Sequence, residues 1–308
     1  MRKPTLRDVA KEAGVSVATV SYVLNNVSKQ SIPDDTKQRV FEAASKLNYV
    51  QNLTAKALSL GKTNVIGVLI VNSADALIPR MVSYGAFLDK LERSCREQGY
   101  HLLVSQINPL EPSFDIIAER KLDGVFLIDA LEHSFHNISS HLPYGTPLVL
   151  VDCLIDDPLF RSVIVNFEGA FAALRASGES SFAVIHEGTS NRLIRHGLQA
   201  ASGLEASDIC AVTSDEKKLR DYIMEQGDRL LVVFNEFLAM RVLKYCAPER
   251  VVAVCTSECP ELLPERVVKF IPGESKGDVA FELLHALLKA PFGPYEDRII
   301  DLQLTKTC

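Results

Sequence analysis

The residues best suited to a chemical role lie between Ser16 and Tyr22. Ser16 can cap a helix. The first outward positions of that helix carry small, hydroxylated or aromatic side chains, namely Val17, Ala18, Thr19, Ser21 and Tyr22. Small groups let a helix approach the base edges of a DNA major groove, where apolar atoms contact thymine methyls and hydroxyls exchange hydrogen bonds. The run therefore predicts recognition of a duplex, although helical corners that bind nothing have the same pattern.

Three short helices are predicted to position this run, and they span 6–13, 17–25 and 33–47. Thr5 and Asp8 have the spacing of a capping box, and Gly14 can end the first helix in the left-handed conformation. The tight turn that follows predicts a helix-turn-helix. Pro33 followed by two acids marks the start of the third helix. The expected inward side chains are Leu6, Val9, Ala10, Ala13, Val20, Val23, Leu24, Val40, Phe41, Ala44 and Leu47.

Charge is distributed unevenly along the chain, whose formal net charge is -6. Residues 1–62 contain ten Lys or Arg and five Asp or Glu, a net charge of +5. The remaining residues contain 23 basic and 34 acidic side chains, a net charge of -11. Because binding to phosphates releases counterions, a basic segment on an acidic body favours a polyanion as the partner of the basic segment alone.

Composition excludes several other classes of protein. The 308 residues are 47% hydrophobic and 23% charged, which is typical of about two globular domains. No apolar run reaches the ~18 residues of a membrane span. We therefore expect a cytoplasmic protein with no membrane partner. Seven scattered cysteines predict reduced thiols. Because His133, His136 and His141 lack zinc spacing and no catalytic motif is present, we expect no metal, no cofactor and no catalytic residue.

Two longer strings carry a resemblance to a known family. TLRDVAKEAGVSVATVSYVLNN begins at Thr5, and KLNYVQNLTAKALSLGKTNVIGVLI begins at Lys46. Together they resemble the head of the lactose-repressor (LacI/GalR) family of bacterial transcription regulators. The resemblance implies a hinge over 50–62 that becomes helical on the operator beside its dimer mate. It also implies that Leu58 enters the minor groove as an apolar wedge.

The candidate DNA contacts combine both lines of reasoning. From the head they are Thr5, Ser16, Val17, Ala18, Thr19, Ser21, Tyr22 and Asn25, and from the hinge they are Asn52, Ala55, Lys56 and Leu58. One departure concerns Gln51, which stands where the family often has proline. The hinge is therefore expected to be less rigidly positioned.

From residue 63 to residue 308, short apolar runs alternate with helical segments. Strands are expected at 65–71, 100–107, 124–128, 147–151, 182–185, 206–212, 230–234, 251–255 and 267–271, and one long helix at 81–98. This alternation predicts an α/β domain of two lobes with parallel sheets. The family resemblance agrees, because its body resembles a periplasmic sugar-binding protein. The fold class is therefore an α helix-turn-helix domain over 1–49 followed by a periplasmic-binding-protein-like domain.

A ligand is expected in the crevice at the carboxyl ends of the strands. The polar candidates there are Asn72, Ser73, Asp75, Asn166, Arg192, Asn235, Glu236 and Thr256. Several positions depart from the family, because Ile194 stands where an arginine is common and Cys255 and Thr256 replace an acidic pair. The stretch 108–120 is also compressed. The effector is thus either unusual or absent.

Three hypotheses remain open at this point. The first is a repressor that binds a palindromic double-stranded DNA operator as a homodimer and responds to a small molecule such as a sugar or nucleoside. The second is a DNA-binding regulator whose body no longer senses a small molecule and serves for dimerisation or protein interaction. The third is a soluble carbohydrate-binding protein.

Overall fold

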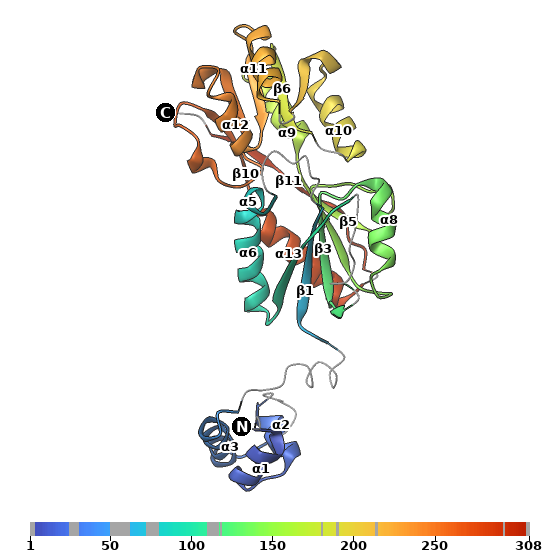
Figure 1. The fold of residues 1–308 in the computed structure, drawn as a ribbon, viewed down its shortest axis with the longest axis vertical. Helices are drawn as coiled ribbons and strands as arrows, with labels where there is room; N and C mark the ends of the chain where they lie inside the picture. The colour runs from blue at the N-terminus through green and yellow to red at the C-terminus, as the bar shows by residue number, and fades with distance from the viewer. Residues whose placement is uncertain are drawn as a thin grey trace. The chain divides into compact units, whose positions relative to one another are not determined.

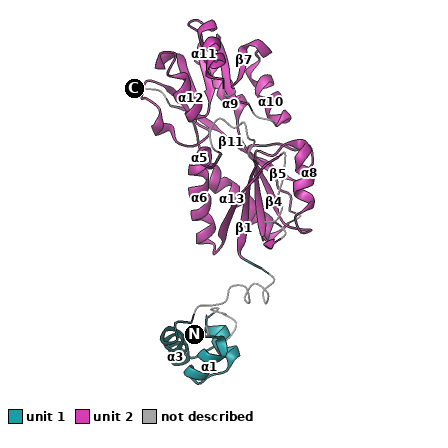
Figure 2. Cartoon of the chain, in the orientation of Figure 1, with its two compact units in different colours: residues 1–63 teal, residues 64–308 magenta. Residues whose placement is uncertain are grey.

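The computed structural model describes residues 4–24, 31–49, 62–71, 80–109, 117, 119–179, 181–188, 191–212, 215–291 and 293–305. The chain forms two compact units, residues 1–63 and 64–308, which Figure 2 draws in different colours. The predicted hinge over 50–62 lies almost entirely outside the described residues, so its boundaries stay a prediction.

The described residues of the first unit form three helices, α1 (Leu6–Ala13), α2 (Val17–Leu24) and α3 (Asp34–Lys46) (Figure 1). The predicted start of α1 is confirmed, because the Thr5 backbone N–H donates to the Asp8 carboxylate over 2.8 Å. Gly14 ends that helix with a φ of 66°. At the start of α2 the Ser16 hydroxyl accepts from the Thr19 N–H over 3.0 Å. Local capping therefore positions both helices of the helix-turn-helix.

The core of the first unit matches the prediction at all but one of the inward positions. Its buried members are Val9, Ala10, Ala13, Val20, Val23, Val40 and Ala43, and Leu6, Leu24, Ala44 and Leu47 pack against them. The prediction for Phe41 is wrong, since this side chain is 53% exposed. The buried residues of α3 are Val40 and Ala43, which lie three residues apart on one face of the helix, and Phe41 is turned about 100° away from Val40.

The second unit has two lobes, each built on a six-stranded sheet. The first-lobe sheet has the order β11-β5-β4-β3-β1-β2 and the second-lobe sheet the order β12-β10-β9-β8-β6-β7. The first-lobe strands are β1 (Val65–Val71), β2 (His101–Ile107), β3 (Gly124–Ile128), β4 (Leu148–Val151), β5 (Arg161–Val165) and β11 (Arg298–Ile300). The second-lobe strands are β6 (Phe182–Glu187), β7 (Ile209–Val212), β8 (Leu230–Phe234), β9 (Val251–Val254), β10 (Val268–Pro272) and β12 (Leu302–Thr305).

The prediction of parallel sheets is confirmed except at one edge, where β12 pairs antiparallel with β10. The sequence prediction missed β5, β11 and β12. It also merged two helices, because the expected helix at 81–98 is α5 (Arg80–Ser83) and α6 (Gly85–Glu97), separated at Tyr84.

Helices cover both faces of each sheet (Figure 1). In the first lobe α6 and α13 (Lys276–Lys289) pack on one face and α8 (Glu132–Ser140) on the other. In the second lobe α9 (Phe167–Ala176) and α10 (Arg192–Ser202) pack on one face, and α11 (Glu216–Glu225) and α12 (Glu236–Val242) on the other. The described part of the second lobe also contains single turns of 3-10 helix at Ala206–Asp208, Pro248–Arg250 and Pro260–Leu262.

The chain passes between the lobes at three places, and hydrogen bonds join all three. The Asn166 side chain donates to the Asp301 carboxylate over 2.8 Å, and its backbone N–H donates to the Ile300 carbonyl over 2.8 Å. The Gly273 N–H donates to the Asp301 carbonyl over 2.8 Å. Asn166 thus belongs to the connection between the lobes.

Gly277 allows α13 to approach α6 closely. A Cβ at this position would lie 2.8 Å from the Phe87 carbonyl oxygen and 3.0 Å from the Leu91 nitrogen, both backbone atoms of α6. We expect Gly277→Ala to lower the free energy of unfolding by about 1–3 kcal/mol, measured by urea denaturation, because the two helices must separate. Gly197→Ala on α10 is the matched control, since its Cβ would meet nothing within 4 Å. A similar loss in both variants would contradict the argument.

Candidate functional site

The outward side of α2 is the first candidate site. Val20 and Val23 hold this helix against the core, while Val17 and Tyr22 are 42% and 39% exposed. Ala18 is also exposed. The exposed surfaces of Val17, Ala18 and Tyr22 are therefore available to a partner.

Other predicted DNA contacts have structural roles or lie outside the described residues. The Thr5 hydroxyl donates to Asp8 over 2.7 Å, and the hydroxyls of Ser16 and Thr19 lie 2.8 Å apart. Ser21 is half-buried. The residues outside the described part of the chain are Asn25, Asn52, Ala55, Lys56 and Leu58.

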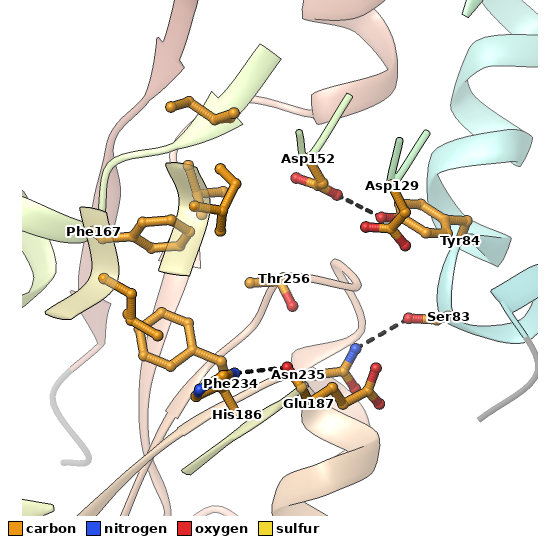
Figure 3. Close-up of a pocket in the computed structure, with 14 residues that line it drawn as sticks. Ser83, Tyr84, Asp129, Asp152, Phe167, His186, Glu187, Phe234, Asn235 and Thr256 are labelled. Carbon is orange, nitrogen blue, oxygen red and sulfur yellow. Dashed lines mark hydrogen bonds between the residues drawn. The ribbon is translucent and has the colours of Figure 1, made fainter. Parts of the chain in front are cut away.

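The second candidate site is a cavity of about 120 Å³ between the two lobes of the second unit (Figure 3). It is lined from the carboxyl ends of β3, β4, β5, β6, β8 and β9 and from α5, α9 and α10. The crevice predicted from the sequence is therefore present. Its location follows from the parallel strands, which all end at the same edge of each sheet.

Three carboxylates line this cavity, and the sequence prediction missed all of them. Asp129 follows β3, Asp152 follows β4, and Glu187 ends β6. Asp129 and Asp152 have φ values of 56° and 53°, in the left-handed region that side chains other than glycine seldom occupy. Such conformations are concentrated at functional sites. An acid directly after a buried apolar run was the available signal.

Asp152 is the centre of a charged network on the first-lobe side of the cavity. It accepts from the Tyr84 hydroxyl over 3.0 Å and from Lys276 Nζ over 2.7 Å. Lys276 is only 1% exposed, and its Nζ also donates to the Thr256 carbonyl over 3.1 Å. Burial lowers the pKa of Lys276, but Asp152, Glu258 and Asp129 outweigh it, so the pKa is raised overall. Lys276 is therefore charged at neutral pH.

Of the ligand candidates predicted from the sequence, Asn235 and Thr256 line the cavity. Asn235 has a φ of 90°, and its side-chain oxygen accepts from the Phe237 N–H to cap α12. Its side-chain nitrogen donates to the hydroxyls of Ser83 and Ser257 over 3.1 and 2.9 Å. Since Ser83 is on α5, Asn235 joins the two lobes.

The remaining ligand candidates do not line the cavity. Asn166 lies in the interlobe connection, and Arg192 is exposed at the start of α10. Glu236 is fully buried and accepts from the N–H groups of Ser257 and Cys259 over 3.0 and 2.8 Å. Burial raises the pKa of this carboxyl, and those two hydrogen bonds oppose the shift. The candidates Asn72, Ser73 and Asp75 lie outside the described residues.

His186 lines the cavity and is buried. Its Nδ1 lies 2.7 Å from the Glu187 carbonyl, which can only accept, so Nδ1 carries a proton and Nε2 is an acceptor in the neutral ring. Burial lowers the pKa of His186, and nearby Arg195 adds to this effect. The ring is therefore neutral at pH 7.

The lowered pKa predicts a pH dependence of stability. As pH falls from about 7 to 5, the unfolded chain binds a proton at the ordinary histidine pKa near 6.5 while the folded chain resists it. The free energy of unfolding should therefore decrease over this window, and His186→Gln should reduce the slope. Urea denaturation at several pH values measures it. The exposed residue His133 on α8 provides the control, since His133→Gln should leave the slope unchanged.

Metal binding and membrane insertion find no support in the described residues. Within that part of the chain, no three His, Cys, Asp or Glu side chains are grouped to hold a metal ion. The same residues include no helix with the length and apolar character of a membrane span.

The helix-turn-helix matches a known protein family. Residues 5–52 match the family described as "Bacterial regulatory proteins, lacI family". The helix-turn-helix segment of the chain therefore carries the lacI-family match. The repressor PurR of Actinobacillus pleuropneumoniae serotype 5b is 30% identical to it over 174 residues, which cover 55% of this chain and 49% of PurR. The catabolite repressor/activator of Escherichia coli is 31% identical over 166 residues, covering 52% of this chain and 47% of that protein.

The chain spans about half the length of these curated relatives. They are named as transcriptional regulators and not as enzymes, in agreement with the sequence expectation that the chain has no catalytic activity.

Solved structures match the fold over nearly the whole chain. The lac repressor dimer bound to operator and the anti-inducer ONPF matches with a TM-score of 0.76 and 18% identity, covering 99% of this chain and 98% of that one. A lacI-family regulator from Silicibacter pomeroyi matches with a TM-score of 0.68 and 20% identity, covering 98% of each chain. The predicted combination of a helix-turn-helix with a two-lobed α/β domain is thereby confirmed.

Proposed function

We propose that this chain is a lacI-family transcriptional repressor that binds a palindromic operator as a homodimer. A small molecule in the interlobe cavity modulates that binding. The observation that carries the proposal is the exposed leading face of α2 within the domain that matches the family.

The geometry of α2 supports DNA reading. Its core-facing valines fix the helix, and its capping serine fixes the start, so the exposed side chains of Val17, Ala18 and Tyr22 are held in a defined arrangement. A rigid helix with small groups in its first turn suits the major groove. The net positive charge of residues 1–62 favours phosphate contacts around it.

The construction of the cleft supports modulation by a ligand. Asn235 bonds to Ser83 across the lobes, and Asn191 on the second lobe donates to the carbonyls of Ala130 and Leu154 on the first, over 3.1 and 2.9 Å. A molecule between the lobes would change these contacts, and a ligand shifts a conformational equilibrium only through such differential contacts.

The dimer and the hinge contacts are part of the proposal. A palindromic site presents two equivalent half-sites, which a two-fold symmetric dimer matches. The lac repressor, which has this fold, is a dimer on its operator in the solved structure. In this chain Asn52, Ala55 and Lys56 would contact the DNA, and Leu58 would act as the minor-groove wedge.

The decisive experiment recovers genomic DNA fragments bound by the purified full chain at physiological ionic strength. We expect a small set of fragments that share a palindrome, and affinities that fall steeply as salt rises. Binding of all fragments alike would overturn specific recognition. The same assay on metabolite-treated protein tests modulation, and unchanged DNA affinity with every metabolite that binds would favour a body that serves only for dimerisation or protein contacts.

A further inference from the structure

The charge of the cavity identifies the kind of ligand it can hold. Its described lining contains the carboxylates of Asp129, Asp152 and Glu187 but no lysine or arginine. A crevice of one sign of charge between apolar walls concentrates ligands of the opposite sign.

Lys276 offsets only part of this negative charge. Its ammonium group is 2.7 Å from Asp152, and Asp152, Glu258 and Asp129 all stabilise its charged form. The single positive charge of Lys276 is thus shared among three neighbouring carboxylates. His186 adds no positive charge at neutral pH, because burial lowers its pKa.

The hydrogen-bonding groups of the lining are mainly acceptors. The Tyr84 hydroxyl already donates to Asp152, and the Asn235 amide donates to Ser83 and Ser257. His186 donates from Nδ1 to a backbone carbonyl, which leaves Nε2 as an acceptor. A ligand that donates hydrogen bonds therefore fits this lining better than one that needs to accept them.

An apolar part of the lining lies opposite Asp129 and Asp152. Phe167 and Phe234 pack edge to face with ring centroids 5.4 Å apart. In Figure 3 the ring of Phe167 lies across the cavity from Asp129 and Asp152. Ile164, Val165, Ile194 and Leu198 also line the cavity. A ligand that fits the acceptors on one side of the cavity and the apolar residues on the other has a hydrogen-bond donor group attached to an apolar body.

We infer that the cavity binds a small organic cation, a primary amine or amidinium carried on an apolar body, in place of a neutral sugar or nucleoside. This inference rests on the proposed function of the cleft as an effector site. The cationic head contacts the acids at the ends of β3 and β4, and the apolar body packs against Phe167 and Phe234.

Titration calorimetry on the full chain tests the assignment with probes of one shape and three charges: 2-phenylethylamine, 2-phenylethanol and phenylacetate. Agmatine, glucose and adenosine complete the panel. We expect 2-phenylethylamine to bind at least about 10-fold more tightly than the alcohol, since a charge-assisted hydrogen bond is about twice as strong as a neutral one. Phenylacetate should give no measurable binding.

Two matched variants locate the binding. Asp129→Asn should weaken 2-phenylethylamine about 10-fold and leave 2-phenylethanol unchanged, because it removes only a charge. Asp156→Asn removes the same charge from an exposed first-lobe residue that does not line the cavity, and it should change neither affinity. Equal losses in both variants would overturn the site.

The outcomes separate this inference from the proposed function. If glucose, adenosine or 2-phenylethanol binds more tightly than both amines, the cation assignment is overturned while the cleft remains an effector site. If neither amine binds, the assignment is likewise overturned. If no probe binds and DNA affinity responds to no metabolite, the effector role itself fails, whatever the DNA-binding result.

Discussion

Ala18→Asp is expected to weaken binding to the cognate operator about 10- to 100-fold, which corresponds to the 1–3 kcal/mol carried by a good base contact. Ala18 is exposed in the first turn of α2, so a carboxylate there would meet base edges and phosphates directly. The folding of the first unit should not change, because this side chain has no role in the core.

Fluorescence anisotropy with a recovered operator and a random duplex, at fixed salt, measures the effect. The matched control is Ser45→Asp, which adds the same charge at an exposed position of α3. Ser45→Asp should reduce affinity much less, and equally for both duplexes. If the two variants lose the same affinity, only net charge matters and α2 is not the reading helix.

Most of the first unit could be predicted from the sequence because its determinants are local. The contacts of Thr5 with Asp8 and of Ser16 with Thr19 span three residues, and Gly14 ends α1 by its own conformation. The error at Phe41 has a different origin. Hydrophobicity alone assigned it inward, whereas only the packing of three helices decides which side of α3 is covered.

In the second unit, the central strands were predictable and the edges were not. Central strands such as β3 and β4 are buried apolar runs that can be recognised from the sequence alone. β11 and β12 are short and follow a proline-containing segment, and they form only by pairing with β5 and β10 from distant parts of the chain. Neither strand carries a local sequence pattern that predicts this long-range pairing.

The candidate ligand site was also predictable only in part. Its position at the carboxyl ends of the strands followed from the fold, and Asn235 and Thr256 were identified for that reason. The neighbour Glu236 follows the same strand but is the first residue of α12 and is buried away from the cavity. Lys276 could not be anticipated, because its partner Asp152 is 124 residues away.

Lys276→Met is expected to lower the free energy of unfolding of the second unit by about 3 kcal/mol. The substitution keeps an unbranched side chain of similar length but leaves Asp152, with Asp129 and Glu258 nearby, without the buried ammonium group that stabilises them. Removing one partner of a buried ion pair exposes the other to the full cost of its desolvation. Urea denaturation at pH 7 measures the loss, and Lys289→Met, an exposed lysine on the same helix, should cost less than about 1 kcal/mol.

A double variant distinguishes the ion pair from simple packing. Lys276→Met combined with Asp152→Asn removes both charges, so it should recover part of the stability that Lys276→Met loses, because no carboxylate then remains at that position to be desolvated.

The pH profile gives a second test. Since the pKa of Lys276 is raised in the folded chain, its stabilisation is fully present below the ordinary lysine pKa of 10.5 and is lost only as pH rises through the higher folded value. The difference in stability between the wild-type chain and Lys276→Met should therefore stay constant from pH 7 to 9. A double variant no more stable than Lys276→Met alone would show that the methionine side chain fails to pack and that the ion pair is not what holds α13 against the ends of β3 and β4.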